Sequence, residues 1–329
     1  MLLAGLGASC RRGARSRGRQ VVLYCSVDQN IAEPVVAAFE RHTGIKVLAR
    51  YDTEASKTVG LVQRLRSEAR SGRPAADVFW SSEVFYTIRL AREGLLEPHL
   101  PQAAQDLPAQ FADPQRRWHG FALRARVIAY NTRRVRPEEA PRRLEDLLES
   151  KWRGRLVMAA PEFGTTGGDV ASWFVHYGPK RAREILRGLK ANGIRLVDGN
   201  SSAVRSVARG QADICLTDTD DVYAARRNGW PVAMNFLDQG GDGVLVIPNT
   251  VALVRGAARP AEAKALVAFL LSARVEEMLA RSDSHNTPVR ASLAGRFEQY
   301  RIPRVLKVDY QAVADRLAEA VRAAREILR

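Results

Sequence analysis

Three carboxylates stand within four residues of one another, in a polar segment that follows a predicted strand: Asp218, Asp220 and Asp221. Negative charges at this spacing repel one another, and a hard cation or several hydrogen-bond donors would relieve the repulsion. The simpler alternative is that one of them caps the next helix while the others face water. We expect at least one to contact a ligand, with Asp28 and Glu83 approaching from the opposite side of a cleft. For a metal ion, the predicted ligands are Asp218, Asp220 and Glu83.

A second polar segment, 164–168, reads Gly-Thr-Thr-Gly-Gly and precedes a helix predicted over 168–177. Hydroxyl and backbone N–H groups at a helix start favour an anion, because the helix dipole adds partial positive charge there. No Gly-Lys-Ser/Thr follows, so this is not a nucleotide-binding Walker loop. A plain threonine N-cap is the alternative, and the same two interpretations apply at 200–201. The predicted anion contacts are Thr165, Thr166, Gly167, Asn200 and Ser201.

The histidines and cysteines form no catalytic pattern. None of the five histidines lies in a His-Glu-x-x-His or Gly-x-Ser-x-Gly frame. The three cysteines, Cys10, Cys25 and Cys215, have neither metal-site nor disulfide spacing. Asp218 and Glu83 could serve as an acid/base pair, but no other feature supports this role. We therefore predict no catalytic residue and no cofactor, apart from a metal ion carried as cargo.

Strand-like and helix-like segments alternate along the chain, which predicts α/β architecture with doubly wound sheets. Two long apolar runs, near 121–131 and 244–254, join two α/β blocks, so the chain should cross twice between two lobes. We predict lobe 1 over 20–121 plus 252–282, and lobe 2 over 122–251 plus 283–329, with a C-terminal helix over 310–328. The polar segments follow strands, where ligands bind in open α/β sheets.

The net charge of +15 comes partly from a basic leader within residues 1–19. No nucleic-acid motif and no basic stripe with aromatic residues accompanies it, so we predict no nucleic-acid partner. The first ten residues form a short apolar run that ends in small residues before Cys10, like the tail of a lipoprotein signal peptide. No later segment has the roughly 20 apolar residues of a membrane span. We expect export, with lipidation at Cys10 as the only membrane attachment.

With these segments in view, the chain resembles the type II periplasmic binding proteins of ABC importers, and most of all their ferric-ion-binding branch. The resemblance covers about 21–290 and rests on five segments, which occur in this order: Val22-Leu23-Tyr24-Cys25-Ser26, Phe39-Glu40-Arg41-His42-Thr43-Gly44-Ile45, Pro74-Ala75-Ala76-Asp77-Val78-Phe79-Trp80, Gly199-Asn200-Ser201 and Pro248-Asn249-Thr250-Val251-Ala252-Leu253. It implies two lobes hinged by two crossing strands, with ligand in the cleft.

The resemblance also implies a ligand set, from which this chain departs. Iron-binding members hold the metal with two adjacent tyrosines, often with a histidine and a glutamate, and an anion completes the shell. Here the tyrosine segment reads Thr-Asp-Thr-Asp-Asp over 217–221, and Tyr223 follows two residues later. The histidine region contains Asp28 and the glutamate region contains Glu83, whereas the predicted anion contacts fall where the family binds its anion.

We therefore expect a periplasmic or cell-envelope monomer that delivers a small ionic ligand to an ABC transporter permease. Carboxylates also suit hard metals, so three ligands stay open: iron held by carboxylates, a metal–anion complex, and an organic anion such as a phosphonate or sugar phosphate. We favour a metal ion or metal–anion complex. A ligand-sensing receptor and an enzyme on the same scaffold are further alternatives, because a fold alone does not fix function.

Overall fold

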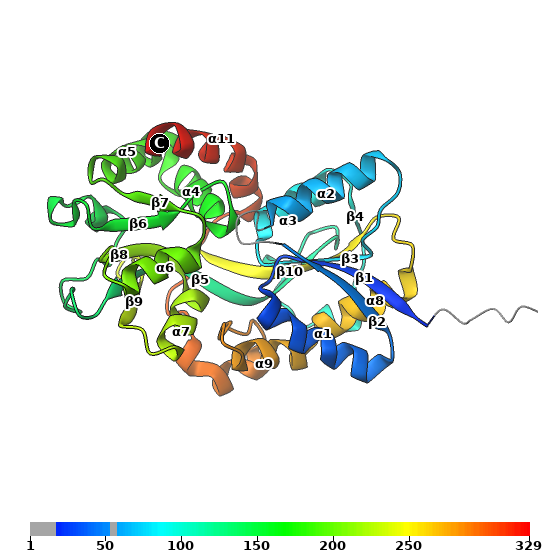
Figure 1. Ribbon diagram of the computed structural model, residues 1–329. Helices are drawn as coiled ribbons and strands as arrows, with labels where there is room; N and C mark the ends of the chain where they lie inside the picture. Colours follow the sequence, from blue (N-terminus) through cyan, green and yellow to red (C-terminus); the bar gives the residue numbers. More distant parts are fainter. Residues whose placement is uncertain (1–17, 53–57) are drawn as a thin grey trace, which may run out of the picture.

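The computed structural model describes residues 18–52 and 58–329. The predicted leader and Cys10 lie mostly or wholly outside these ranges. The described part has two α/β lobes side by side (Figure 1). Lobe 1 contains these elements: β1 (Gln20–Cys25), α1 (Gln29–Thr43), β2 (Lys46–Tyr51), α2 (Val59–Arg70), β3 (Val78–Ser81), α3 (Val84–Arg92), β4 (Leu96–Glu97), α8 (Pro260–Leu270) and α9 (Ala273–Arg281).

Lobe 2 contains the elements that follow the first crossing of the chain: β6 (Leu156–Ala159), α4 (Gly164–His176), α5 (Gly178–Ala191), β7 (Arg195–Val197), α6 (Asn200–Ala208), β8 (Ile214–Asp218), α7 (Thr219–Arg227), β9 (Val232–Phe236) and α11 (Tyr310–Leu328). The short α10 (Ala291–Ala294) precedes α11. The long strands β5 (His119–Asn131) and β10 (Val246–Val254) belong to both lobes.

The strands are hydrogen-bonded in the order β2-β1-β3-β10-β5-β8-β6-β7, with β4 beside β10 and β9 beside β5. The pairs within β1–β3 and within β6–β8 are parallel, whereas β5 and β10 run antiparallel to their neighbours. The first half of β5 pairs with β10 and its second half pairs with β8 and β9. The two predicted crossings are therefore these two strands. The register of β10 shifts between Pro248 and Asn249, consistent with a proline that has no N–H to donate to a regular ladder.

Every residue of β5 and β10 is buried, which explains why both read as continuous apolar runs in the sequence. One core cluster lies between lobe 1's strands and helices α1, α8 and α9, and another lies between lobe 2's strands and helices α6 and α7. The largest cluster covers the other face of the sheet in both lobes, under α3, α4, α5 and α11. The two lobes therefore share part of their core.

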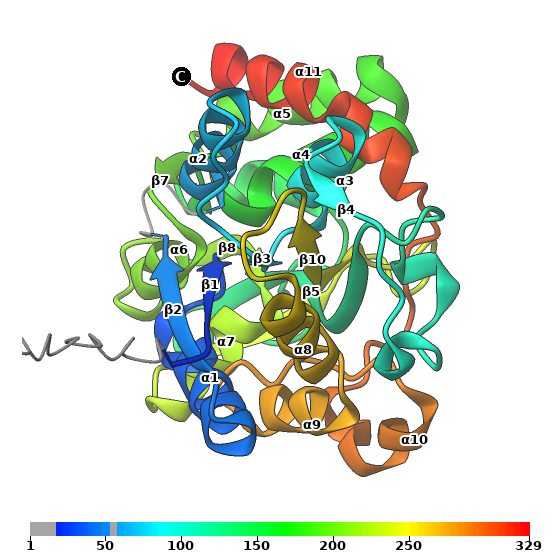
Figure 2. The same ribbon diagram turned by 90° about the vertical axis from the view of Figure 1, so that its right-hand side faces the viewer.

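The C-terminal helix α11 has the predicted bounds and connects the two lobes. Asp309 caps it by accepting a 2.8 Å hydrogen bond from the Gln311 backbone N–H. Its buried residues recur at helical spacing, and the helix packs against α4, α5 and α3 (Figure 2). Tyr310 stacks on Phe85 of α3, with ring centroids 5.7 Å apart. The last helix of lobe 2 therefore packs against α3 of lobe 1.

Helix α4 begins at Gly164, four residues before the predicted start at Gly168, so the sequence prediction of a loop at 164–167 was wrong. The glycines are needed for packing inside the helix and do not end it. A β-carbon at Gly168 would lie 2.3 Å from the Phe85 ring, and one at Gly167 would lie 2.5 Å from the Pro161 carbonyl oxygen. Close contact between α3 and α4 therefore outweighs the low helix propensity of glycine.

None of the described helices is long and apolar enough to cross a membrane. The fold agrees with the predicted class of two α/β lobes joined by two crossing strands. The exact lobe boundaries given from the sequence remain predictions.

Candidate functional site

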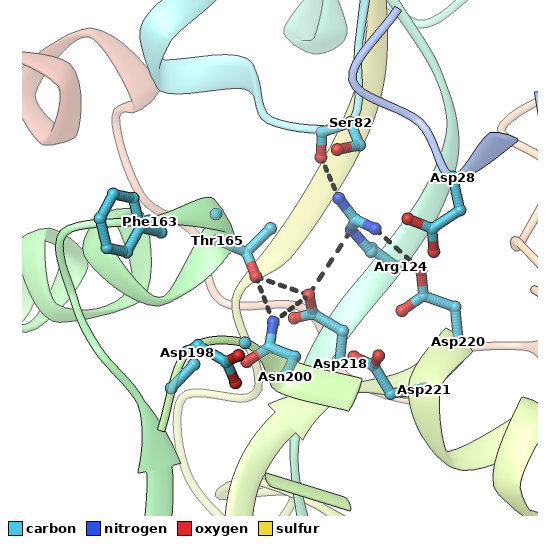
Figure 3. Close-up of a pocket in the computed structure, with 13 residues that line it drawn as sticks. Asp28, Ser82, Arg124, Phe163, Thr165, Asp198, Asn200, Asp218, Asp220 and Asp221 are labelled. Carbon is cyan, nitrogen blue, oxygen red and sulfur yellow. Dashed lines mark hydrogen bonds and ion pairs between the residues drawn. The ribbon is translucent and has the colours of Figure 1, made fainter. Parts of the chain in front are cut away.

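A pocket opens between the two lobes at the ends of strands β1, β3, β6, β7 and β8 (Figure 3). Lobe 1 supplies Asp28 and Ser82, and β5 supplies Arg124. Lobe 2 supplies the remaining lining residues: Ala159, Phe163, Gly164, Thr165, Asp198, Gly199, Asn200, Asp218, Asp220 and Asp221. Carboxylates and one guanidinium group thus face the same small space, in the position where ligands bind in open α/β sheets.

Arg124 stands at the centre of this pocket and joins its two walls (Figure 3). Its Nη1 donates a 2.8 Å hydrogen bond to Oδ2 of Asp220 in lobe 2, and its Nη2 donates to the Ser82 carbonyl oxygen in lobe 1. Its Nε lies 3.7 Å from Oδ2 of Asp218. Among the described residues, this buried Nε has no hydrogen-bond partner.

Arg126 lies two residues further along β5, so its side chain leaves the same face of the strand. Its Nε donates to Oδ2 of Asp169 at 3.0 Å, and its Nη1 donates to Oδ1 of Asp218 at 2.8 Å. Nη1 also lies 3.2 Å from the Thr165 hydroxyl. The Arg126, Asp169 and Asp218 side chains are buried, so removing the guanidinium would leave Asp169 in the interior without its cation and Asp218 with only the more distant Arg124.

Asp218 is the most fully bonded of the three clustered carboxylates. Arg126 occupies its Oδ1, while Oδ2 accepts from the Thr165 hydroxyl at 2.5 Å and from the Asn200 amide at 3.0 Å. Burial alone would raise the pKa of Asp218, but the charges of Arg126 and Arg124 and the Thr165 hydrogen bond outweigh it and lower that pKa. Asp218 is therefore a charged residue that fixes the wall of the pocket.

Asp220 is bonded on one side only. Its Oδ2 accepts from Arg124, while its buried Oδ1 has no hydrogen-bond partner among the described residues. Burial, together with the charge of Asp218, raises the pKa of Asp220 in spite of the opposing charge of Arg124. A cation or a donor at Oδ1 would relieve this cost, so Asp220 is the carboxylate best placed to bind a ligand.

Asp221 completes the acidic cluster. Its two oxygens accept hydrogen bonds from the Ser201 and Thr217 hydroxyls, both at 3.0 Å. One oxygen from each of Asp218, Asp220 and Asp221 lies within 4.8 Å of the others, close enough to share a cation. Since Asp218 and Asp221 are both hydrogen-bonded at both oxygens, we expect Asp220 to contribute most to any such site.

Six of the ten predicted ligand residues line the pocket: Asp28, Thr165, Asn200, Asp218, Asp220 and Asp221. Ser201, Thr166 and Gly167 are absent from its lining. Ser201 bonds Asp221, Thr166 donates to the Asn200 amide oxygen at 3.2 Å, and Gly167 packs against the Pro161 carbonyl. These three residues support the lining residues in this structure, and their predicted contact with a ligand stays a prediction.

Glu83 is the fourth predicted residue outside the pocket lining. It caps α3, its Oε2 accepting a 2.9 Å hydrogen bond from the Tyr86 backbone N–H, and it is completely buried. Its Oε1 has no partner among the described residues and would lie 3.0 Å from a β-carbon at Gly168 of lobe 2. Burial raises the pKa of Glu83 to about 7, although backbone N–H groups and Arg124 oppose the shift. Its predicted metal contact stays untested.

Sequence reasoning missed the two arginines, which organise the whole site. Both lie in the run near 121–131, which we interpreted only as an apolar crossing strand. Charged residues at alternate positions of such a strand point to one face, and buried arginines require carboxylate partners. Two arginines at alternate positions of an apolar strand were therefore the sequence pattern that could have predicted this part of the site. Ser82, Phe163 and Asp198 were also missed, and nothing in their spacing distinguishes them from ordinary loop residues.

Tyr223, which follows the acidic segment, does not take the place of the missing tyrosine pair. Its ring lies against His285 and Tyr300, with centroid distances of 5.3 Å to each. It is absent from the lining of the pocket.

The two α/β lobes, the crossing strands and the charged pocket between the lobes define a two-lobed binding protein. Residues 73–311 match the family of bacterial extracellular solute-binding proteins, and the chain belongs to this family. This confirms the prediction of an extracellular binding protein and not an enzyme.

Two relatives and one solved structure indicate what the chain is similar to. It is 28% identical to iron uptake protein A1 of Synechocystis sp. over 84% of this chain and 77% of that protein. It is 29% identical to the major ferric iron-binding protein of Neisseria meningitidis serogroup B, over 77% of this chain and 76% of that protein. Iron-bound HitA from Pseudomonas aeruginosa superposes with a TM-score of 0.82 at 24% identity, covering 94% and 99% of the two chains, which shows the shared fold.

Proposed function

We propose that the chain is the substrate-binding component of an ABC importer and that it captures a metal ion of the iron type together with an anion. The permease of the importer is the partner that receives the cargo. We further propose that the protein acts as a monomer in the periplasm and that Cys10 attaches it to the membrane through lipid. The names of the relatives as iron-binding and iron-uptake proteins support the metal.

One observation carries the choice of a metal–anion complex. Two buried polar atoms of opposite charge, Oδ1 of Asp220 and Nε of Arg124, lack hydrogen-bond partners among the described residues. Both side chains line the same pocket. Arg124 would repel a bare cation, and the carboxylates of Asp220 and Asp221 would repel a bare anion. A cation with its anion satisfies both charges, with the metal at the carboxylates and the anion at the guanidinium.

The chemistry of the donors suits a hard cation. Carboxylate oxygens bind hard metal ions, and the acidic cluster takes the place in the chain where the resemblance led us to expect tyrosines. Asp28 adds a carboxylate from lobe 1. A cargo that contacts Asp28 and Asp220 together stabilises the closed arrangement of the lobes, since it binds that state better than an open one. Closure is then the signal that the permease reads.

Calorimetry with the purified protein tests this function. We expect ferric iron supplied as its citrate complex to bind, whereas citrate alone and a sugar phosphate alone bind much more weakly. Asp220→Asn and Arg124→Gln should each reduce affinity for the complex by about 30-fold or more, because each removes the charge that pairs with one part of the cargo. Glu326→Gln, an exposed change on α11, is the control and should leave affinity unchanged. Tight binding of the sugar phosphate without metal would instead establish the organic-anion alternative.

A further inference from the structure

Helices α5 and α11 lie side by side on the outside of lobe 2, where both pack against α4 (Figure 1, Figure 2). Arg183 of α5 pairs with Glu319 of α11 at 3.2 Å. Further along both helices, the Lys190 ammonium donates to the Leu328 and Arg329 carbonyl oxygens at 2.8 and 3.0 Å. The contacts follow the same order along the two helices, so the helices run in the same direction and form one continuous surface.

This surface has an excess of positive charge. The two helices, of 14 and 19 residues, contain eight basic and four acidic side chains. Their surplus of four positive charges is more than a quarter of the net charge of the 329-residue chain, +15. Residues three and four apart lie on one face of a helix, and at this spacing the cations form a stripe on each helix. The stripe on α5 is Lys180, Arg183, Arg187 and Lys190, and the stripe on α11 is Arg322 and Arg325, continued by Arg329.

Four cations of these stripes are available to a partner. They are exposed, and their charged groups have no hydrogen bond or ion pair with any described residue: Lys180, Arg187, Arg322 and Arg325. Three of the four carboxylates of the two helices, by contrast, are already held in ion pairs with arginines. An anionic surface laid against the two helices would therefore meet more free cations than free carboxylates.

The surroundings of the stripes favour a membrane surface over a protein as the partner. The large hydrophobic side chains that the described residues expose are Leu48, Leu100 and Val305, and none of them lies on α5 or α11. The buried centre of a protein–protein interface is apolar, whereas anionic lipid headgroups attract cations that are spread over a surface. Two stripes of arginine and lysine without an exposed apolar centre fit the headgroups.

We propose that the surface of α5 and α11 binds the anionic headgroups of a lipid bilayer through Lys180, Arg187, Arg322 and Arg325. It adds a second contact with the membrane to the lipid at Cys10, which the sequence alone predicts as the only one. The contact keeps lobe 2 at the membrane, where the permease receives the cargo. None of the four cations lines the pocket between the lobes, so the cleft stays accessible.

Co-sedimentation with vesicles tests this surface in the full chain carrying Cys10→Ser, which removes any acyl chain. We expect binding to phosphatidylcholine vesicles that contain about 30% phosphatidylglycerol, and much weaker binding to phosphatidylcholine alone. Raising NaCl from about 0.05 to 0.5 M should release the protein, because salt screens exposed charges.

The test variant replaces the four free cations together: Lys180→Gln, Arg187→Gln, Arg322→Gln and Arg325→Gln. It should bind the anionic vesicles about 100-fold more weakly, since each basic residue adds to the attraction. The matched control removes the same charge from exposed arginines of lobe 1 that also lack partners: Arg41→Gln, Arg73→Gln, Arg255→Gln and Arg274→Gln. It should stay within about threefold of the parent chain, because salt screens charges far from the bilayer. Thermal melts of both variants should match the parent, since exposed side chains without partners add little stability.

Equal losses of binding in the two variants would mean that overall charge alone draws the chain to the vesicles, and the assignment to α5 and α11 would be wrong. Equal binding to both kinds of vesicle, or binding to neither, would also overturn it. If the chain binds only vesicles that carry the permease, and the α5–α11 variant loses that binding, the surface docks a protein and not lipid.

Discussion

Arg124 and Arg126 leave the same face of one strand, two residues apart, yet they serve two different regions of the site. Arg126 donates to Asp169, Asp218 and Thr165, although its buried Nη2 has no hydrogen-bond partner among the described residues. Arg124 reaches Asp220 in lobe 2 and the Ser82 carbonyl in lobe 1, and its Nε remains without a hydrogen bond. Arg124 and Asp220 line the pocket, whereas Arg126 and Asp169 are absent from its lining.

The difference shows how one strand can provide both a support and a binding surface. Hydrogen bonds from Arg126 hold Asp218 and Thr165 in place. These two residues line the pocket together with Arg124 and Asp220. The Arg124 region keeps unpaired polar atoms at the cleft, where an incoming ligand can satisfy them. Buried groups that lack partners cost folding free energy, and binding a ligand recovers part of that cost.

The strongest test of this comparison replaces each arginine in turn with methionine. Arg126→Met should lower the free energy of unfolding by about 3–5 kcal/mol, because it leaves the buried charge of Asp169 without a cation and removes the nearer of the two cations of Asp218. Arg124→Met should cost clearly less, since Asp220 borders the pocket and its side chain is 15% exposed, so water can reach its charge. Urea unfolding of the ligand-free proteins at neutral pH measures both values.

The control for that pair is Arg133→Met, an exposed position just beyond β5, which should stay within about 0.5 kcal/mol of the wild type. Equal losses for Arg124→Met and Arg126→Met would contradict the distinction between an arginine that lines the pocket and one that does not.

A smaller effect, at Glu83, sharpens the comparison, because this buried carboxylate has no arginine in direct contact among the described residues. Its pKa of about 7 in the folded protein exceeds the ordinary value of 4.5, so folding favours the protonated form. The contribution of Glu83 to the free energy of unfolding is fully present below about pH 4.5, and it is lost as the pH rises from there through 7. Glu83→Gln removes the titration and should gain up to about 3 kcal/mol over the wild type by pH 8, with little gain at pH 4.5.

Urea unfolding of wild type and Glu83→Gln at pH 4.5, 6 and 8 measures that difference. The glutamine oxygen can still accept from the Tyr86 N–H, so the helix cap is retained. A constant difference at all three pH values would mean that Glu83 does not titrate with the folded state in this way.

Much of the fold follows from the sequence, because periodicity and burial decide it. The two apolar runs became β5 and β10, and the C-terminal helix has the bounds that its apolar spacing predicts. The start of α4 could not be predicted locally. Gly167 and Gly168 suggest a loop, and only the approach of Pro161 and Phe85 reveals why the helix needs them.

The site was predictable in part, for a different reason. The carboxylates and the Thr165 hydroxyl follow strand ends, and strand ends meet in this class of fold. Which carboxylate stays available depends on hydrogen bonds between distant segments, such as those that Thr165 and Asn200 give to Asp218. The arginines were missed because two charges inside an apolar run did not outweigh its overall hydrophobicity.

The most direct test of the central claim is native mass spectrometry, with elemental analysis, of the protein purified from its own host. The account predicts that the folded protein carries one iron-type metal ion together with an anion, and that both are lost from Asp220→Asn. A protein that carries an organic anion and no metal would contradict it.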